Sequence, residues 1–440
     1  MEEKLHKRAI SAWTMYDWAN SAFATTIMAA VLPVYYSSVA AANLPGYEAT
    51  AKWGFTTAIA ALIAALISPV LGAMADFRGS KKRFLTIFMI IGVTATALLY
   101  FVGTGDWLLA SLLFVFGNVG FAGSLVYYDA LLPHVARPDE IDQVSSRGYA
   151  MGYIGGGVLL AVNLVMIMLV PSLFPEAQQG NITGLMTRLS FVTVAIWWFI
   201  FTLPLLRRVS EPARRILPGE AHLNPLQASI GRLVKTFKEI SRYRDLATFL
   251  LAFWIYTNGI GTIITMATIY GAEIGISQTT LIGTLLMVQF LAAPFAILFG
   301  RLAKKIGPKP SIYIALGIYS LIAIAGYFLQ HEWQFWALGA AVATVQGGSQ
   351  ALSRSLMGKL IPPSKSAEFY GFFAVFEKFA SILGPLLFGV VSTLMHNSRF
   401  SIVSLIVFFS LGMLLLTRVN VPRGIASAAT EEAEMMAASS

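Results

Sequence analysis

Long apolar segments recur along the whole sequence and are separated mostly by short polar connections. A bilayer core about 30 Å thick requires about 20 residues of helix, so each of these segments is long enough to cross it. The pattern predicts twelve spans, at residues 10–37, 53–75, 84–103, 107–130, 145–171, 187–207, 246–271, 279–301, 310–329, 333–360, 367–395 and 399–418. We therefore predict an all-α polytopic membrane protein with twelve transmembrane helices.

Basic residues concentrate on one predicted side of the membrane. Nearly all of the 31 Lys and Arg residues fall in segments that the twelve spans place on the same side; the exceptions are Lys52, Arg188, Arg399 and the intramembrane Lys378. Because basic loops stay in the cytoplasm, we expect a multi-pass protein of the plasma (inner) membrane with both termini cytoplasmic. The net charge of +9 then reflects topology, and we expect no nucleic-acid partner.

The composition supports a membrane protein and offers no catalytic motif. Apolar residues make up 57% of the chain and charged residues 12%, about half the share of about 25% in soluble domains. The chain has no cysteine, and its five histidines do not form an HExxH motif. No GxxxxGK[ST] motif occurs, which excludes an ATP-driven pump for this chain. We expect no enzymatic activity, cofactor or metal.

A long connector divides the spans into two sets of six. We expect residues 1–207 and 246–420 to form two six-helix bundles, joined by a cytoplasmic connector at 208–245. The segment NPLQASIGRLVKTFKEISRYRDL within it predicts an amphipathic helix, which either lies on the inner leaflet or packs on the protein's own cytoplasmic face. The acidic, alanine-rich tail at 421–440 is expected to be disordered.

The two sets of six spans carry corresponding motifs. GAMADFRGSKKR follows the second span and GRLAKKIGPK follows the eighth, so Gly72 corresponds to Gly300 and Gly79 to Gly307. YYDALLP and MGKLIP end the fourth and tenth spans. Matched loops in two six-span halves indicate parallel pseudo-repeats, an architecture that supports alternating access around a site near the bilayer midplane.

These motifs resemble those of a known transporter family. GAMADFRGSKKR is similar to the cytoplasmic loop signature of the major facilitator superfamily. YDWANSAFAT, YYDALLP, SSRGYAMGYIGGG, GGSQALSRSL and KFASILGPLLFG resemble, more narrowly, the branch containing the autophagy-related vacuolar amino-acid effluxer and its bacterial relatives. The resemblance covers nearly the whole chain. It implies the major facilitator fold and a secondary transporter whose substrates are amino acids or similar small metabolites.

Spans 1, 4, 7 and 10 line the central cavity in this superfamily, so the resemblance points to polar residues on them. Three positions depart from the pattern common in the branch: Asp129, Asn258 and Glu377. The candidate substrate or proton site combines these with polar and aromatic residues of the cavity-lining spans, namely Asp17, Asn20, Ser21, Tyr128, Tyr256, Gln350 and Arg354, and with Lys378 of the eleventh span. Lipid-facing or core packing is the alternative for each tyrosine.

Asp17 is the clearest of these candidates. If the first span runs over 10–37, Asp17 lies about 9 Å from its middle at 1.5 Å per residue. An ionised carboxylate at that depth is costly unless it faces water or a partner. Asp17, Asn20 and Ser21 recur at three and four residues and share one helix face. Asp17 therefore either faces the cavity in a proton-linked role or ties the span to a neighbouring helix.

Charged residues in the tenth and eleventh spans present the same problem. Glu377 and Lys378 are neighbours about 100° apart on a helix, so each is expected to have a partner elsewhere, with Asp17 and Asp129 as candidates. Lys378 is assigned either to a substrate carboxylate or to an ion pair between helices. A buried Glu377 would tend to be protonated, as proton coupling requires. Arg354 either serves substrate binding or gating, or anchors the cytoplasmic end.

The loop between the second and third spans is a candidate cytoplasmic gate. We assign this role to Gly72, Asp76, Arg78, Gly79, Lys81 and Arg83. Charged groups between helix ends can hold that side closed through ion pairs and helix-dipole contacts. Simple anchoring by positive charge explains Lys81 and Arg83, but it does not explain Asp76 or Gly79.

Together these observations favour a secondary active transporter of a small solute that works by alternating access and is coupled to protons. Its expected partners are the small-molecule substrate, protons and the lipid bilayer, and we expect it to function as a monomer. Two alternatives stay open: a lipid or drug exporter of the same fold, with a largely apolar cavity, and a receptor or regulator that binds a ligand without transport.

Overall fold

Helices form all the regular secondary structure in the part of the chain that the structure describes. The structure is a computed structural model that describes residues 2–212, 231 and 243–439. Its first half contains α1 (Glu2–Ala22), η1 (Phe23–Ala30), α2 (Leu32–Tyr35), η2 (Tyr36–Ala40), α3 (Gly46–Arg78), α4 (Lys81–Leu98), η3 (Leu99–Phe101), α5 (Trp107–Val135), α6 (Ile141–Met168), η4 (Pro171–Leu173) and α7 (Glu176–Arg208). Its second half contains α9 (Arg244–Glu273), α10 (Gln278–Ile306), α11 (Pro308–Tyr327), α12 (Glu332–Leu360), η6 (Pro363–Lys365), α13 (Ser366–Met395), α14 (Ser398–Ser404), α15 (Ile406–Thr417) and α16 (Val421–Ser439).

The predicted all-α membrane architecture is confirmed. Within the described residues, 11 helical segments are long and apolar enough to cross a bilayer. The predicted span at 333–360 corresponds to α12, which is a helix of 29 residues but does not belong to these 11 segments. Its polar stretch GGSQALSRS lowers its hydropathy, and most of that stretch is buried in protein. The count of twelve spans therefore stays a prediction.

The helices are grouped into two compact units. Unit 1 comprises residues 1–67, 81–128 and 151–211, and unit 2 comprises residues 68–80, 129–150 and 212–440. Two short segments from the first half of the sequence, 68–80 and 129–150, thus belong to the same unit as the second-half helices. The division of the chain into a 1–207 bundle and a 246–420 bundle remains a proposal.

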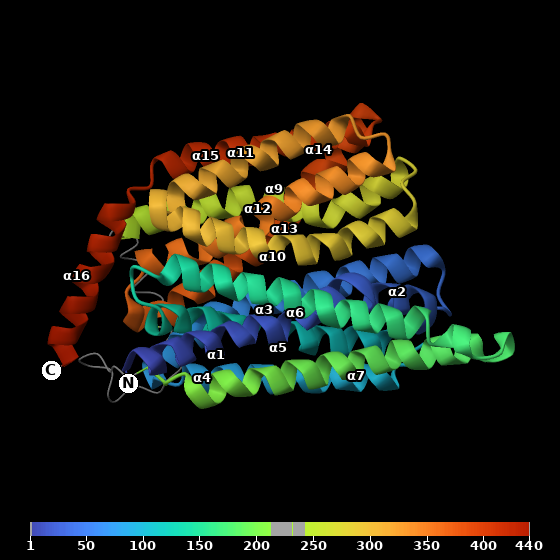
Figure 1. Ribbon diagram of the computed structural model, residues 1–440, viewed down its shortest axis with the longest axis horizontal. Helices are drawn as coiled ribbons and strands as arrows, with labels where there is room; N and C mark the ends of the chain where they lie inside the picture. Colours follow the sequence, from blue (N-terminus) through green and yellow to red (C-terminus); the bar gives the residue numbers. More distant parts are fainter. Residues whose placement is uncertain (1, 213–230, 232–242, 440) are drawn as a thin grey trace. The chain divides into compact units, whose positions relative to one another are not determined.

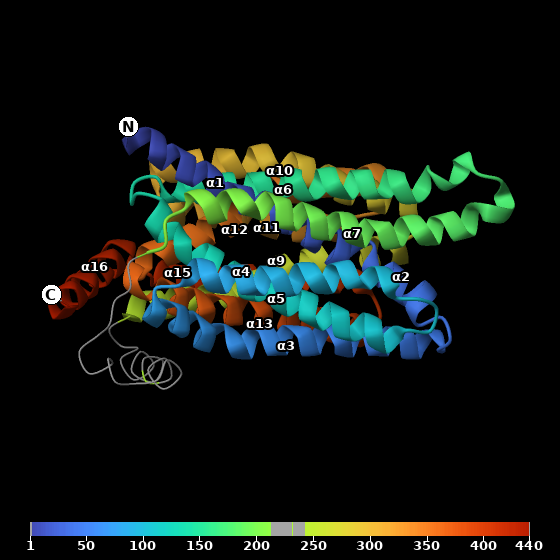
Figure 2. The same ribbon diagram turned by 90° about the horizontal axis from the view of Figure 1, so that it is seen from below.

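Unit 1 is organised around α1 and α7. Helix α7 packs against both α1 and α4 (Figure 1), and Figure 2 shows α7 joined to α6 through the short η4 turn. Glycines let α6 approach α1 closely: a Cβ at Gly152 would lie 2.6 Å from Ser21 Oγ, and one at Gly155 would lie 2.6 Å from the Trp18 carbonyl oxygen. Small residues therefore set the distance between these two helices.

The first span is not a continuous α-helix. Residues Phe23–Ala30 form the π-helical segment η1, in which the Val31 N–H donates to the Thr26 carbonyl five residues earlier, at 2.8 Å. The first residue of η1, Phe23, is buried, and its ring stacks on Phe121 with ring centroids 5.2 Å apart. Such π segments are rare and occur often at functional sites. This one comes immediately after the polar face of Asp17 and Asn20.

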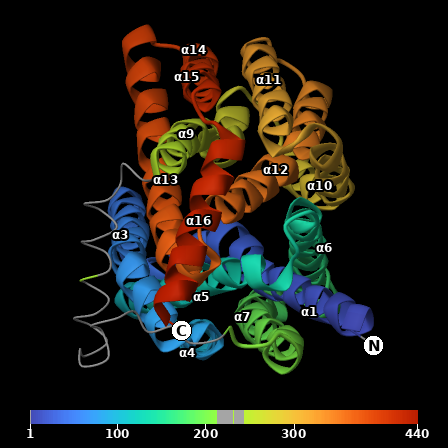
Figure 3. The ribbon, with the colours of Figure 1, turned by 90° about the vertical axis from the view of Figure 1, so that its left-hand side faces the viewer.

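Unit 2 contains two groups of packed second-half helices. Figure 3 shows them nearly end-on: α12 packs against α10 and α11, whereas α9 packs against α13 and α15. The Tyr256–Ser353 hydrogen bond of 2.6 Å links α9 to α12. Gly348 allows a similarly close contact within the first group, because a Cβ there would lie 2.2 Å from the Phe299 ring of α10.

The expectation of a disordered C-terminal tail is wrong for residues 421–439. They form the helix α16, which crosses the ends of α9 and α12 (Figure 1). Its Glu431 is buried and forms an ion pair with Lys365 at 2.6 Å, and it also accepts a hydrogen bond from Tyr243. Glu432 accepts hydrogen bonds from Ser364. The alanine-rich composition suits a helix, and these specific partners dock it.

The predicted amphipathic helix of the connector lies outside the described residues, apart from Gly231 and its last residues from Tyr243 onward. Described residues bracket it. Val209 ends α7 with its N–H bonded to the Leu205 carbonyl, and Arg244 begins α9. The prediction for this connector therefore stays untested.

The Lys365–Glu431 pair should contribute measurably to stability. Lys365→Met leaves the buried Glu431 carboxylate without its cation, which is expected to lower the free energy of unfolding by about 3 kcal/mol. The matched control is Lys7→Met, whose pair with Glu3 is solvent-exposed and contributes about 0–1 kcal/mol. Thermal unfolding of the purified protein in detergent compares the two variants. Equal melting temperatures would show that the α16 contact does not stabilise the protein.

Candidate functional site

The end of α3 packs against the start of α13 inside unit 2. The Asp76 carboxylate is buried and accepts a hydrogen bond from the backbone N–H of Glu368, with a distance of 2.7 Å. Glu368 belongs to the first turn of α13. The first N–H groups of a helix have no partner within the helix and carry a partial positive charge, so a carboxylate there is stabilised. Asp76 therefore caps α13.

Two close backbone contacts accompany this cap. A Cβ at Gly72 would lie only 2.1 Å from the Ala367 carbonyl oxygen, and one at Gly371 would lie 2.7 Å from Pro69 Cα. Only glycine allows the two helices to approach so closely. We call the group formed by Pro69, Gly72, Asp76, Ala367 and Glu368 the α3–α13 contact.

The other predicted gate residues have different positions. Gly79 has a φ of 58° and ends α3 in the left-handed conformation, which favours glycine. Lys81 is buried and begins α4 in unit 1, and Arg83 is exposed. The structure does not describe the side chain of Arg78. Gly72 and Asp76 are thus the predicted gate residues whose described contacts reach α13 within unit 2.

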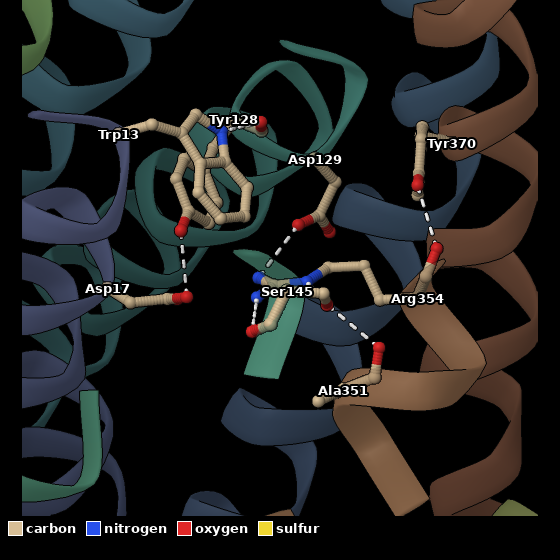
Figure 4. A network of polar contacts seen from close by, with 8 residues as sticks. All are labelled: Trp13, Asp17, Tyr128, Asp129, Ser145, Ala351, Arg354 and Tyr370. Atoms are coloured by element: carbon tan, nitrogen blue, oxygen red, sulfur yellow. Dashed lines mark hydrogen bonds and ion pairs between the residues drawn. The ribbon is translucent and has the colours of Figure 1, made fainter. Parts of the chain in front are cut away.

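A buried ion pair joins two further segments of unit 2. Arg354 Nη1 of α12 lies 3.2 Å from Asp129 Oδ1 of α5, and the two side chains are 2% and 17% exposed (Figure 4). Ser145 of α6 accepts from Arg354 through its hydroxyl at 2.9 Å and its carbonyl at 2.8 Å. The Ser145 hydroxyl in turn donates to the Ala351 carbonyl. The guanidinium is therefore compensated both by a charge and by neutral acceptors.

A second ion pair joins α12 to α6. Lys359 Nζ of α12 lies 2.5 Å from Asp142 Oδ2 of α6, and both side chains are largely buried. Gly358 is tightly packed, because a Cβ there would lie 2.8 Å from the Tyr370 hydroxyl. Asp142 and Lys359 are not among the predicted site residues, because both lie near the predicted ends of their spans.

A pocket of about 180 Å³ lies in unit 2 directly beside this network. Four predicted site residues line it together, namely Tyr256, Gln350, Glu377 and Lys378. Aromatic rings and small hydroxyls complete the wall, from Tyr149, Phe253, Phe373, Thr257, Ser349 and Ser353. The pocket thus combines a carboxylate and an ammonium group with aromatic surface, as expected for a small polar solute.

Tyr149 connects the pocket to the buried ion pair. Its ring lines the pocket and also lies over the guanidinium of Arg354, whose Cζ is 4.3 Å from the ring centroid. A cation over an aromatic face is attracted by the ring quadrupole. Arg354 itself does not line the pocket, so the structure places it behind Tyr149. The sequence held one signal for Tyr149, which lies within the family-like segment SSRGYAMGYIGGG.

Asn258 differs from the other predicted residues of α9. It is fully buried, its Nδ2 donates to the Trp254 carbonyl, and its Oδ1 accepts from the Gly384 N–H at 3.1 Å. It does not line the pocket. The second bond reaches α13 where a Cβ at Gly384 would lie 2.5 Å from the Asn258 carbonyl oxygen. Asn258 therefore holds α9 and α13 together.

Asp17 and Tyr128 meet inside unit 1. The Tyr128 hydroxyl of α5 donates to Asp17 Oδ2 of α1 at 2.8 Å, and both residues are buried (Figure 4). Trp13 stacks on the Tyr128 ring at 4.3 Å and donates to the Tyr128 carbonyl. Asp17 thus ties α1 to α5. Asn20 is also buried, and its Nδ2 has no hydrogen-bond acceptor among the described residues.

The predicted pairing of Glu377 and Lys378 with Asp17 or Asp129 stays a prediction. Asp129 forms its ion pair with Arg354, and Asp17 bonds to Tyr128. Glu377 is exposed and Lys378 is half-buried in the pocket wall. Both acids thus have described partners on other helices, and Glu377 and Lys378 line the pocket.

Comparison with known proteins gives a consistent family. The family described as "Vacuole effluxer Atg22 like" matches residues 47–429. The MFS-type transporter YxiO of Bacillus subtilis (strain 168) is 39% identical over 92% of this chain and 93% of its own length. Autophagy-related protein 22-1 of Penicillium rubens is 23% identical over 98% of this chain and 92% of its own length.

Solved structures show the same fold. The proton:xylose symporter XylE, bound to 6-bromo-6-deoxy-D-glucose, has a TM-score of 0.73 at 15% identity and covers 98% of this chain and 100% of its own. The transporter FucP in its outward conformation has a TM-score of 0.70 at 12% identity, with 94% and 98% covered. Both proteins are transporters of the major facilitator superfamily, which confirms the predicted fold.

The close approach of α3 and α13 should depend on glycine at position 72, because glycine has no Cβ. Gly72→Ala is expected to separate the two helix ends, because its Cβ cannot lie 2.1 Å from the Ala367 oxygen. Since the chain has no cysteine, Ser366→Cys provides a single buried reporter. Maleimide labelling of that cysteine should become several-fold faster with Gly72→Ala.

Gly317→Ala is the matched control, because a Cβ there meets no atom within 4 Å. Labelling should stay at the rate of the Ser366→Cys protein alone. If Gly72→Ala labels as slowly as the control, the close approach at Gly72 does not keep this region closed.

Proposed function

Because the chain belongs to the Atg22-like family of the major facilitator superfamily, we propose that it carries an amino acid or a similar small metabolite by alternating access, coupled to protons. Membership of this family makes the chain a secondary transporter, which is a multi-pass membrane protein and not an enzyme. Location in the plasma membrane, cytoplasmic termini and function as a monomer belong to the proposal.

The pocket of unit 2 is the observation that carries the substrate class. Glu377 and Lys378 place opposite charges on one wall, and Tyr149, Phe253 and Phe373 supply apolar surface. A zwitterion with a short side chain matches both features. The ammonium of Lys378 suits a substrate carboxylate, and the carboxylate of Glu377 suits a substrate amine, through charge-assisted hydrogen bonds.

The α3–α13 contact supports a gating step. Asp76 holds the N-terminus of α13, and Glu377 and Lys378 lie further along this same helix. Release of Asp76 would free the start of α13 without disturbing its interior. Movement of α13 would then change access to the pocket and the positions of its two charged residues together. This connection gives the gate a direct mechanical link to substrate binding.

A single peptide bond connects the Asp17–Tyr128 hydrogen bond with the Asp129–Arg354 ion pair, because Tyr128 and Asp129 are adjacent in the chain. Tyr128 bonds to Asp17 in unit 1, and the next residue, Asp129, pairs with Arg354 in unit 2. Protonation of Asp17 would weaken its acceptor interaction with Tyr128, because a neutral carboxyl group accepts less strongly than a carboxylate. Helix α5 would transmit that change to Asp129. We propose this as the route by which protonation of Asp17 in unit 1 influences the ion pair in unit 2.

Lys378→Gln tests the substrate role. Loss of one charge-assisted hydrogen bond corresponds to about 1.5–3 kcal/mol, so half-maximal counterflow should require at least about tenfold more substrate. The measurement is counterflow in proteoliposomes, screened first with amino acids, peptides and nucleosides. Lys305→Gln removes the same charge at an exposed position outside the pocket and should leave counterflow unchanged. Identical concentration dependence in the two variants would remove Lys378 from the site.

Asp17→Asn tests proton coupling separately from binding. The amide still accepts a hydrogen bond from Tyr128 but cannot release a proton at neutral pH. Counterflow without a gradient should persist, whereas accumulation driven by an imposed pH gradient should be lost. Tyr128→Phe removes the same hydrogen bond and keeps the carboxyl group, so gradient-driven accumulation should be weakened but not abolished. Full accumulation by Asp17→Asn would contradict the proton role.

A further inference from the structure

A groove of about 630 Å³ lies between α9 and α15, at the end of both helices where α16 begins. Three arginines, Arg244, Arg418 and Arg423, line it together with Ala247, Leu251 and Leu415. It is separate from the pocket that contains Glu377 and Lys378. Figure 3 shows α9 and α15 side by side within unit 2.

The charges of this groove are only partly compensated. Arg423 forms a bidentate pair with the buried Asp245, at 2.6 Å from Nε and 2.8 Å from Nη2. Arg244 and Arg418 are exposed, and neither side chain forms an ion pair within the described part of the chain. The groove therefore keeps two unneutralised guanidinium groups, which bind phosphate oxygens well because of their planar, bidentate geometry.

The wall below the arginines is mostly apolar, and the hydroxyl of Thr248, which also lines it, donates to the Arg244 carbonyl. From Arg244, the positions Ala247 and Leu251 follow at three and four residues and share one face of α9. On α15, Leu415 lines the groove, and the exposed side chains of Leu414, Leu411 and Val407 continue along the helix away from Arg418. A cationic end followed by an exposed apolar helix face matches the shape of a phospholipid, with its phosphate above its acyl chains.

We propose that this groove binds the headgroup of an anionic phospholipid of the inner leaflet. Arg244 and Arg418 contact the phosphate, and the acyl chain lies against Leu251 and the exposed leucines of α15. Arg423 extends the same surface onto α16. Basic grooves between helices on the cytoplasmic side bind such headgroups in other membrane proteins. The apolar wall distinguishes this ligand from free phosphate, which would gain nothing from it.

The predicted orientation of the protein in the membrane also supports an anionic phospholipid as the ligand of this groove. Lys309 also lies at this end of unit 2, where its ammonium donates to the carbonyls of Thr417 and Val419 at 3.2 and 2.8 Å. It thereby satisfies carbonyl groups at the end of α15, while the two free guanidinium groups point to an external anion. The predicted topology places this end in the cytoplasm, on the side where anionic lipids give the leaflet its negative potential.

Binding of defined lipids to the full-length protein tests this proposal. Wild-type protein in detergent is titrated with phosphatidylglycerol and, in parallel, with phosphatidylcholine of the same acyl chains, and bound lipid is counted by native mass spectrometry. Phosphatidylglycerol should bind at least about tenfold more tightly. The double variant Arg244→Gln, Arg418→Gln should weaken that binding about 30-fold, as expected for two basic residues near a lipid surface.

The matched control is Lys304→Gln, Lys305→Gln, which removes two exposed charges in the last turn of α10 and lies outside the groove. It should retain wild-type binding. Equal affinity for the two lipids, or equal losses in both double variants, would overturn the proposal. Inorganic phosphate that displaces phosphatidylglycerol at equal concentration would identify a simple anion site instead.

Single variants protect the test against misfolding. Arg418→Gln changes one exposed side chain and should still weaken phosphatidylglycerol binding about fivefold, while Arg418→Lys keeps the charge and should retain most of it. No substrate transport is measured, so the outcome does not depend on the proposed function. An unchanged affinity in a folded Arg418→Gln variant would contradict the role of this arginine.

Discussion

A charged group in a low-dielectric interior must have a compensating partner, and this requirement governs the centre of unit 2. Arg354 is almost completely buried, which is sustainable only because Asp129, both Ser145 oxygens and the Tyr149 ring surround its guanidinium. Removing one member would leave the others buried with unsatisfied charge or hydrogen bonds. Segments from three different helices are thereby fixed to one another. The pocket wall inherits its geometry from this arrangement.

The sequence predicted the features that depend on hydropathy and on local spacing. Apolar length located the membrane helices, because hydrocarbon permits no other way to satisfy the backbone. Gly72 was singled out as part of a repeated loop motif, and it lies where Ala367 leaves no space for a Cβ. Of the predicted site residues, Tyr256, Gln350, Glu377 and Lys378 line one pocket in the structure.

The remaining features depend on contacts between distant residues, which spacing does not encode. Asp129 and Arg354 are separated by 225 positions, and their pairing follows only from the way α5 and α12 pack. Asn258 resembled a cavity residue by its position, yet its amide bridges two helices through backbone groups. The composition of the C-terminal tail indicated disorder, whereas residues 421–439 form α16, with partners at Ser364 and Lys365.

The π-helical segment η1 has a consequence for the phase of the first span. A continuous α-helix would fix the angle between its two ends through a constant advance of about 100° per residue. The i→i+5 bond from Val31 to Thr26 accommodates one additional residue, which rotates everything beyond it. The side chains of Tyr35 and Tyr36 therefore do not have the orientation relative to Asp17 that a continuous α-helix would give them. This rotation lets Asp17 reach Tyr128 at one end of the span while Tyr35 packs on Phe191 at the other.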